Sequence, residues 1–183
     1  MKLLFPKPYA DFVARLRVPC GFVLVAAFAW FSHPDTRSLA LGLPVSIVGL
    51  LVRAWAAGHL AKNQTLAASG PYAYTRNPLY LGTLLVAAGL AVASRSVGLG
   101  ALFAAVFLCI YLPVIQLEQQ HLHNLFPEYA AYAARVPALL PRMTPATGAA
   151  RAFQWALYVK NREYQAAAGF LGGALFLLWK ALR

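Results

Sequence analysis

The sequence predicts an all-α, multi-pass integral membrane protein with about five transmembrane helices and amphipathic segments on its cytoplasmic face. Of the 183 residues, 61% are hydrophobic and only 11% are charged, and the mean hydropathy is +0.60. A soluble protein of this size does not need so apolar a surface. The apolar residues form several long runs of bilayer-crossing length, separated by short polar turns. These observations indicate a single membrane domain over residues 1–183.

Each apolar run predicts one membrane-crossing helix. Pro113 is expected to kink the fourth of them. The turn between the third and the fourth, Ser94-Arg95-Ser96, leaves no room for a long loop, so these two helices should form an antiparallel hairpin. The predicted spans are residues 19–31, extended backward over 13–18; residues 39–60; residues 79–93; residues 97–117; and residues 166–182.

Three other segments have the composition of the membrane interface. Residues 1–18 mix basic and aromatic side chains and predict an amphipathic lead-in. Residues 118–134 place leucines and aromatic residues at helical spacing, which predicts amphipathic helix on the membrane face, with Pro127 starting a second short helix. Residues 146–165 combine aromatic and basic residues in an interfacial pattern.

The charges predict the orientation and one kind of partner. The formal net charge is +11, but the basic residues lie singly between apolar runs, which favours anionic lipid head groups over nucleic acid. Twelve of the Lys and Arg residues fall on the side of the N-terminus and four on the other. The N-terminus and the polar segments after the second and fourth spans are therefore predicted to be cytoplasmic.

No metal site is predicted. Cys20 and Cys109 lie inside apolar runs without Cys or His neighbours at ligand spacing, so we interpret them as packing residues. His121 and His123 are two positions apart and do not share a helix face.

Two polar, aromatic stretches are where chemistry is expected: residues 70–82 and residues 118–132. Gly70 and Pro71 break any preceding helix, and Asn77-Pro78 can start a new one, with Asn77 as the cap and Pro78 at the first helical position. Such a start leaves backbone N–H groups and a partial positive charge beside Arg76, which suits an anion. Asn-Pro caps and interfacial arginines also occur in membrane loops that bind nothing.

The two stretches together carry a family resemblance. The first reads Gly70-Pro-Tyr-x-x-x-Arg76-Asn-Pro78-x-Tyr80-x-Gly82, and the second contains Glu118 followed by Leu122, Phe126, Tyr129, Tyr132, Val136, Pro137 and Pro141. Over residues 50–141 the chain resembles the isoprenylcysteine carboxyl methyltransferase and phospholipid methyltransferase superfamily. The family often has His at the position of Asn77 and a second Glu at the position of Gln119. Asn77 keeps a hydrogen-bonding side chain, whereas Gln119 removes a carboxylate.

The resemblance implies a membrane enzyme that binds S-adenosyl-L-methionine at the cytoplasmic face and takes a lipid-like substrate from the bilayer. The cofactor's groups fit the residues: Glu118 can take the ammonium, Arg76 and the N–H groups after Asn77 the carboxylate, and tyrosines the adenine. A single Tyr in such a segment can equally be an interfacial anchor. The predicted cofactor-binding residues are Tyr74, Arg76, Asn77, Pro78, Tyr80, Glu118, Gln119, Tyr129 and Tyr132.

Arg53 and His59 are the candidates for the substrate side, and Arg53 and Glu118 are the predicted catalytic residues. Arg53 lies in an otherwise apolar run, where a charge marks either function or a side chain that snorkels to the interface. If it functions, it can hold a substrate carboxylate or phosphate. His59 can be a base for an amine substrate or an interfacial residue. Methyl transfer itself needs mainly positioning and exclusion of water.

Two other functions fit the same pattern. One is a sterol-reductase-like membrane enzyme that uses NADPH, which needs a basic pocket for the extra phosphate. The other is a non-catalytic lipid-binding membrane protein of the same fold, consistent with Asn77 and Gln119. The expected methyl acceptor is a membrane lipid or a lipidated small molecule. The sequence leaves open whether it reacts through oxygen, through nitrogen or through another nucleophile. It also leaves the oligomeric state open.

Overall fold

The computed structural model describes residues 4–146 and 151–183, and these residues form helices without any strand. The first three residues of the predicted lead-in, and residues 147–150 of the predicted interfacial segment, lie outside the described residues. The elements are α1 (Lys7–Phe31), α2 (Thr36–Ala57), η1 (Gly70–Ala73), α3 (Pro78–Ser94), α4 (Val97–Val106), η2 (Phe107–Tyr111), α5 (Leu112–Leu125), α6 (Tyr129–Arg135), α7 (Trp155–Lys160) and α8 (Tyr164–Ala181).

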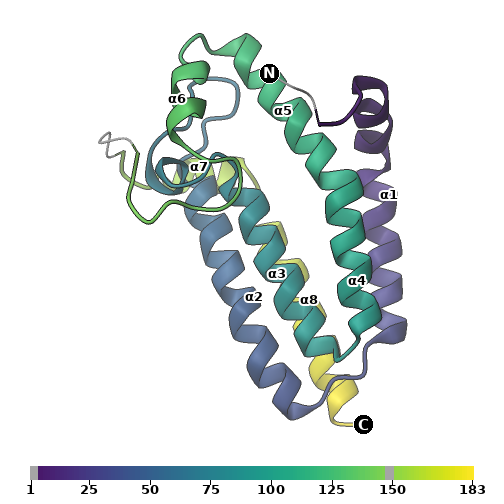
Figure 1. Ribbon diagram of the computed structural model, residues 1–183. Coiled ribbons are helices and arrows are strands. Elements are labelled where there is room, and N and C mark those ends of the chain that lie inside the picture. The colour runs from purple at the N-terminus through teal and green to yellow at the C-terminus, as the bar shows by residue number, and fades with distance from the viewer. Residues whose placement is uncertain (1–3, 147–150) are drawn as a thin grey trace.

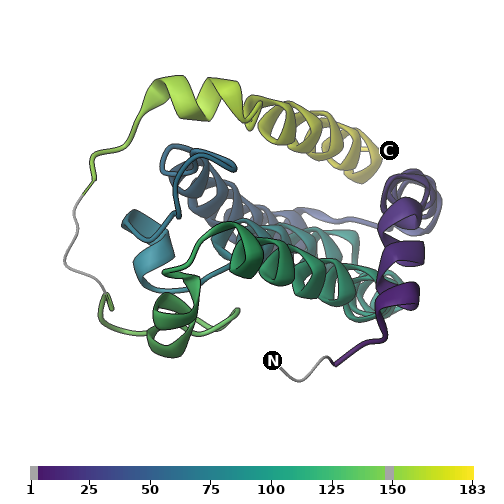
Figure 2. The same ribbon diagram turned by 90° about the horizontal axis from the view of Figure 1, so that it is seen from above.

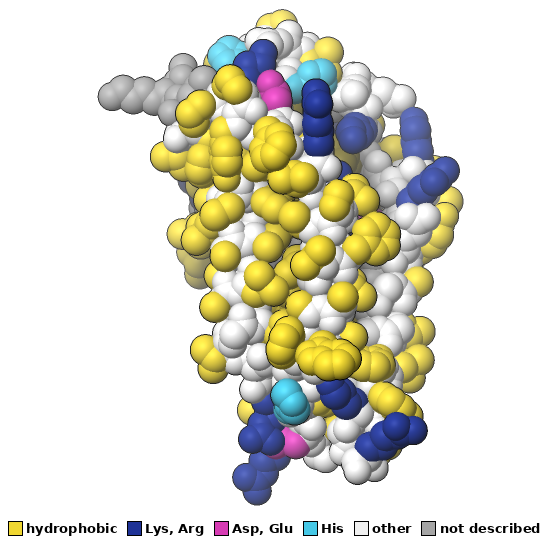
Figure 3. Space-filling model, turned by 90° about the vertical axis from the view of Figure 1, so that its right-hand side faces the viewer, with side chains coloured by type: hydrophobic (Ala, Val, Ile, Leu, Met, Phe, Trp, Pro, Cys, Tyr) yellow, Lys and Arg dark blue, Asp and Glu magenta, His cyan; other side chains and the backbone are white. Residues whose placement is uncertain are grey.

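The long helices run side by side as one bundle (Figure 1). Three of the described helical segments, α1, α2 and the continuous run 97–125, are long and apolar enough to cross a membrane, and α3 is a shorter apolar helix. Hydrophobic side chains cover the middle of the face shown in Figure 3, while Lys, Arg, Asp, Glu and His gather at its two ends. The all-α class is thus confirmed for the described residues, which contain three helical segments able by length and composition to cross a membrane; the count of five spans stays a prediction.

Helices α2 and α3 form the tightest contact of the bundle. A Cβ on Gly42 would lie 2.3 Å from the carbonyl oxygen of Gly89, and one on Gly49 would lie 2.6 Å from that of Gly82. The Ser46 hydroxyl donates to the carbonyl oxygen of Val86 at 3.0 Å across the same interface. Small residues let the two backbones approach closely, which is how helices associate in lipid. This packing fixes the start of α3 relative to the end of α2.

The hairpin of α3 and α4 is as predicted. Helix α3 ends at Ser94, the next residue Arg95 has the left-handed conformation with φ of 53°, and α4 starts at Val97. At this end of the bundle α2 begins with a capping box, in which the Asp35 carboxylate accepts from the Ser38 amide at 2.7 Å. Arg95 forms an ion pair with Asp35, so the turn and the cap support each other.

Two predicted boundaries differ from the structure. The lead-in is not separate, because α1 is continuous from Lys7 through Pro19 to Phe31, although Figure 2 shows its first turns inclined to the rest. The fourth helix continues to Leu125 instead of ending at residue 117, so Glu118 lies inside α5. The polar residues of this last stretch are helix-compatible at a membrane interface, and nothing stops the helix before Phe126.

The region around Pro113 contains a π-helical turn, η2, in place of a simple kink. Pro113 has no N–H to donate to the carbonyl of Cys109, and the Tyr9 hydroxyl donates to that oxygen instead, at 2.8 Å. The Leu112 amide bonds to the carbonyl of Phe107, five residues back. A π-turn of this kind inserts one residue into the helix and shifts the side chains that follow it.

Candidate functional site

A cavity of about 740 Å³ lies at the end of the bundle where α2 ends and α3 begins, a volume within the usual range of small-molecule sites. Its walls come from both predicted polar stretches, from the loop after α2 and from α1. The structure therefore gathers most of the predicted site residues around one space. Those that line it are Arg53, Arg76, Asn77, Pro78, Tyr80, Glu118, Tyr129 and Tyr132.

Hydrogen bonds join the first polar stretch to the segment that follows α6. The Arg76 amide donates to the carbonyl of Pro137 at 2.9 Å, and the Asn77 side-chain amide donates to that of Ala138 at 2.7 Å. The Tyr132 hydroxyl donates to the carbonyl of Tyr72 at 2.8 Å. Asn77 is at the N-cap position of α3, as predicted, but its side chain makes no capping bond. The first turn of α3 thus keeps N–H groups for another acceptor.

Arg76 is incompletely satisfied by the protein. Among the described residues its guanidinium has one hydrogen-bond acceptor, the Tyr129 hydroxyl at 3.4 Å, and its Nε is buried without a partner. Burial raises the pKa of Tyr129, although Arg76 opposes the shift, and burial likewise raises the pKa of Tyr132. Both phenols are therefore neutral at physiological pH. A guanidinium beside an uncapped helix start, with an orphaned N–H, fits a carboxylate ligand.

Glu118 supplies the negative charge of the cavity. Its carboxylate accepts a hydrogen bond from the Tyr80 hydroxyl at 2.8 Å. No cation of the described residues forms an ion pair with it, and its side chain is exposed. The carboxylate is therefore free to meet a positively charged ligand group.

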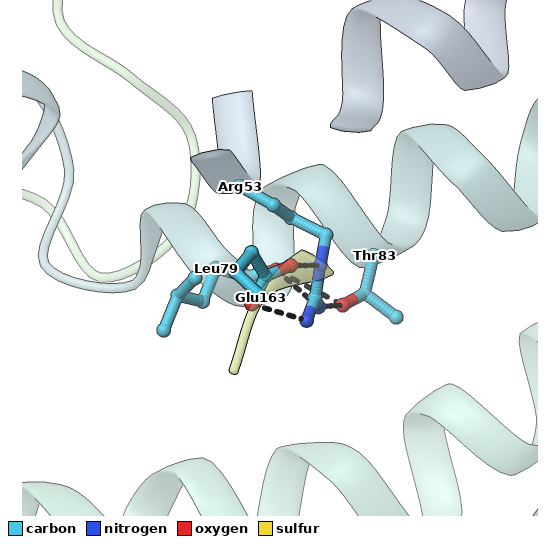
Figure 4. Close-up of polar contacts among 4 residues, drawn as sticks. All are labelled: Arg53, Leu79, Thr83 and Glu163. Carbon is cyan, nitrogen blue, oxygen red and sulfur yellow. Dashed lines mark hydrogen bonds and ion pairs between the residues drawn. The ribbon is translucent and has the colours of Figure 1, made fainter. Parts of the chain in front are cut away.

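Arg53 is held by the protein itself (Figure 4). Its guanidinium binds both carboxylate oxygens of Glu163, with Nη2 at 3.0 Å from Oε2, and its Nη1 donates to the Thr83 hydroxyl. A longer contact of 3.4 Å joins Nη1 to the carbonyl of Leu79. Four of the five N–H groups are thereby used. Arg53 neither snorkels to the interface nor presents an open anion site in this arrangement.

Glu163 is the residue that the sequence analysis missed. It is one of five acidic residues, it directly precedes the last apolar run, and it is buried. Its position was the available signal, because an acidic side chain next to a membrane segment needs a partner.

Three predicted site residues lie outside the cavity lining. The ring nitrogens of His59 contact the carbonyl oxygens of Trp55 and Arg151 at 2.9 and 3.1 Å. Tyr74 packs against Trp55, with ring centroids 6.2 Å apart. Gln119 is half-buried on α5. The structure thus does not bring these side chains to the site.

A second cavity of about 730 Å³ adjoins the first, and mostly apolar residues from α1, α2, α3, α4, η2 and α8 line it. Among its walls are Gly21 of α1, Phe103 of α4 and Gly173 of α8. Arg53, Thr83 and Tyr111 line both cavities. Figure 2 shows α8 on one side of α2 and α3, and α4 and α5 on the other. A polar chamber at the membrane end thus borders an apolar one within the bundle.

The described residues contain no group of three or more His, Cys, Asp or Glu side chains that could hold a metal ion. Cys20 is half-buried and Cys109 is exposed, and both are free thiols.

Comparison with known proteins gives one family and two curated relatives. The model of the phospholipid methyltransferase family matches residues 38–129. The cobalt-zinc-cadmium resistance protein CzcN of Cupriavidus metallidurans is 37% identical over 136 residues, which cover 72% of this chain and 60% of that protein. The nickel-cobalt-cadmium resistance protein NccN of Alcaligenes xylosoxydans xylosoxydans is 33% identical over 151 residues, covering 76% of this chain and 71% of that protein.

The chain thus spans about three fifths of CzcN, and no solved structure shows a significant match to it. The matched region contains Arg53, Arg76, Tyr80 and Glu118. The resemblance read from the two polar stretches is therefore confirmed, and the chain belongs to the phospholipid methyltransferase family.

Proposed function

We propose that this protein is an S-adenosyl-L-methionine-dependent methyltransferase of the membrane that acts on an amphipathic or lipid acceptor. The observation that carries the proposal is that the polar cavity contains an arginine and a glutamate whose side chains are both available to a ligand. Arg76 has an orphaned Nε and Glu118 has a carboxylate without an ion pair. S-adenosyl-L-methionine carries a carboxylate and two positive groups, which these residues can take.

The cofactor's amino-acid part fits between Arg76 and Glu118. Its carboxylate would accept from Arg76 and from the uncapped first turn of α3, and its ammonium would lie against Glu118. The buried rings of Tyr129 and Tyr132, which also line the cavity, suit the adenine. In this view Asn77 acts indirectly, because its side chain fixes the Arg76 segment to residue 138.

The cofactor supplies an activated methyl group. When the cofactor is bound, the acceptor's lone pair would bond to the methyl carbon as the carbon–sulfur bond breaks with its electron pair on sulfur, and any proton on the acceptor would pass to bulk solvent after the transfer. The chain's residues contribute position and exclusion of water. Methyl transfer of this kind does not require a side chain to transfer a proton, so we assign no residue as general acid or base.

The acceptor side is the apolar cavity. Its mostly apolar lining from several helices suits a hydrocarbon chain, and its border with the polar cavity would bring the acceptor's head group to the cofactor. Acceptors that react through oxygen or through nitrogen both fit. The proposal includes five spans, counting α3 and α8, with the N-terminus and the cofactor site in the cytoplasm.

The names of the two relatives describe metal resistance, which gives a physiological setting but no reaction. The proposal rests on the family and on the cavity rather than on those names.

Calorimetric titration of the detergent-purified protein with S-adenosyl-L-methionine and, separately, with NADPH tests the proposal. We expect binding of the former alone. Arg76→Ala and Glu118→Ala should each weaken it by about 2–3 kcal/mol, because each leaves a charged group of the ligand without its partner. Matched controls are Arg135→Ala and Glu128→Ala, which remove the same charges from exposed positions outside the cavity.

Binding of NADPH instead would support the reductase alternative. Binding of neither compound, also in the presence of membrane lipid, would support the non-catalytic lipid-binding alternative. Unchanged affinity in both site variants would refute the assignment of the cavity.

A further inference from the structure

Tyr111 occupies a position that the family motifs do not mark. It is the last residue of the π-turn η2, and it lines both the polar and the apolar cavity. The π-turn precedes Pro113, and Tyr9 satisfies the carbonyl that Pro113 leaves free. Because a π-turn inserts one residue into the helix, it determines which way Tyr111 faces. The local sequence thus builds a special backbone around this ring.

The ring of Tyr111 belongs to an aromatic group next to the carboxylate of Glu118. The centroids of Tyr111 and Tyr80 are 6.0 Å apart in an edge-to-face arrangement, and Phe107 stacks on Tyr111 at 5.9 Å. The Tyr80 hydroxyl donates to Glu118 at 2.8 Å. This bond raises the electron density of the Tyr80 ring and places the Glu118 carboxylate beside it, so a cation next to the Tyr111 ring would meet a negative environment.

The border of the two cavities is where a cofactor's methyl group and an acceptor's nucleophile can meet. Three residues lie there: Arg53, Thr83 and Tyr111. Arg53 is itself a cation, and the Thr83 hydroxyl accepts from Arg53 and donates to the carbonyl of Leu79. Of the three, Tyr111 alone offers an electron-rich surface to a positive centre.

We infer that the ring of Tyr111, beside the Tyr80–Glu118 pair, holds the sulfonium of S-adenosyl-L-methionine and points its methyl group toward the apolar cavity. This inference rests on the proposed function and adds a binding residue to it. A sulfonium is a diffuse cation that is poorly served by hydrogen bonds and well served by aromatic faces. The loss of charge on methyl transfer would then also weaken the hold on the product.

The test compares two ligands that differ in this one group. S-adenosyl-L-homocysteine lacks the methyl group and the positive charge but keeps the adenosine, the ammonium and the carboxylate. Calorimetry of the purified protein gives the ratio of the two dissociation constants. Tyr111→Leu should weaken S-adenosyl-L-methionine roughly five- to thirtyfold and leave S-adenosyl-L-homocysteine unchanged. Tyr111→Phe keeps the aromatic face and should keep the wild-type ratio.

Tyr74→Leu is the matched control, because it removes a tyrosine of the same motif region that lies outside both cavities. Unchanged affinity for S-adenosyl-L-homocysteine also shows that Tyr111→Leu is folded. Equal loss for both ligands, or the same ratio in Tyr111→Leu as in wild type, would overturn the role of Tyr111 and leave the proposed function standing. Binding of neither ligand by the wild-type protein would overturn the proposed function itself.

Discussion

Replacing Glu163 by glutamine should lower the free energy of unfolding by more than the loss of one charge at the surface would. The Arg53 and Glu163 side chains are 22% and 9% exposed, and two hydrogen bonds join them. Glu163→Gln keeps the size and part of the hydrogen bonding but leaves the guanidinium without its counter-charge. Breaking a buried pair by changing one partner costs about 3–5 kcal/mol. Because Arg53 is partly exposed and keeps Thr83, we expect about 3 kcal/mol.

The assay is the free energy of unfolding of the purified protein in one detergent, measured by circular dichroism against denaturant. Arg95→Gln is the control, since the Arg95–Asp35 pair is 56% and 43% exposed and such surface pairs contribute below about 1 kcal/mol. The double variant Arg53→Met, Glu163→Leu removes both charges and should recover most of the loss. A loss below about 0.5 kcal/mol for Glu163→Gln, equal to that of the control, would refute the view that this ion pair holds α8 to the bundle.

Two further predictions concern the bundle itself. Gly49→Ala should destabilise the protein by about 2 kcal/mol, because the added methyl would lie 2.6 Å from the carbonyl oxygen of Gly82. The control Gly172→Ala should not destabilise it, because a Cβ there meets nothing within 4 Å. Equal unfolding curves for the two variants would contradict the close α2–α3 contact. The backbone hydrogen bond from Ser38, assisted by Arg95, lowers the pKa of Asp35. Its stabilising effect is therefore fully present above the ordinary aspartate pKa of about 4 and is lost below it, as the pH falls through the lowered pKa of the folded state. The difference in thermal midpoint between wild type and Asp35→Asn should accordingly shrink in acid, and a difference independent of pH would show that the charge of Asp35 contributes nothing.

The helices could be predicted because their causes are local. Each apolar run specifies its own helix, and the helix boundaries are set by short signals such as the Ser94–Ser96 turn and the Asn77–Pro78 start. The structure has a helix at each apolar run and a boundary at each of these signals. The polar stretches could be predicted to matter because each places aromatic, charged and proline residues next to a long apolar run. Their direct contacts, from Tyr80 to Glu118 and from Arg76 to Tyr129, join residues 38 and 53 positions apart and depend on the tertiary packing.

The site residues that could not be predicted depend on long-range geometry. Arg53 and Glu163 are 110 positions apart, so their pairing depends on where α8 returns to the bundle. Tyr74 follows a short 3-10 helix, η1, and its ring lies against Trp55. The orientation of Tyr111 depends on one inserted residue in η2. An error of one position in the helical register is enough to turn a side chain out of a cavity.

The two halves of the proposed site have different relations to the family. Arg76, Tyr80 and Glu118, which belong to the proposed cofactor site, all lie within the matched residues 38–129. The apolar cavity takes part of its wall from α1 and α8, through residues such as Gly21 and Gly173, which lie outside that match. Family membership therefore supports the proposed cofactor far more than it supports any particular acceptor. If the proposed function holds, the acceptor's apolar part is selected by the two flanking helices, and members of the family with other acceptors should differ there first.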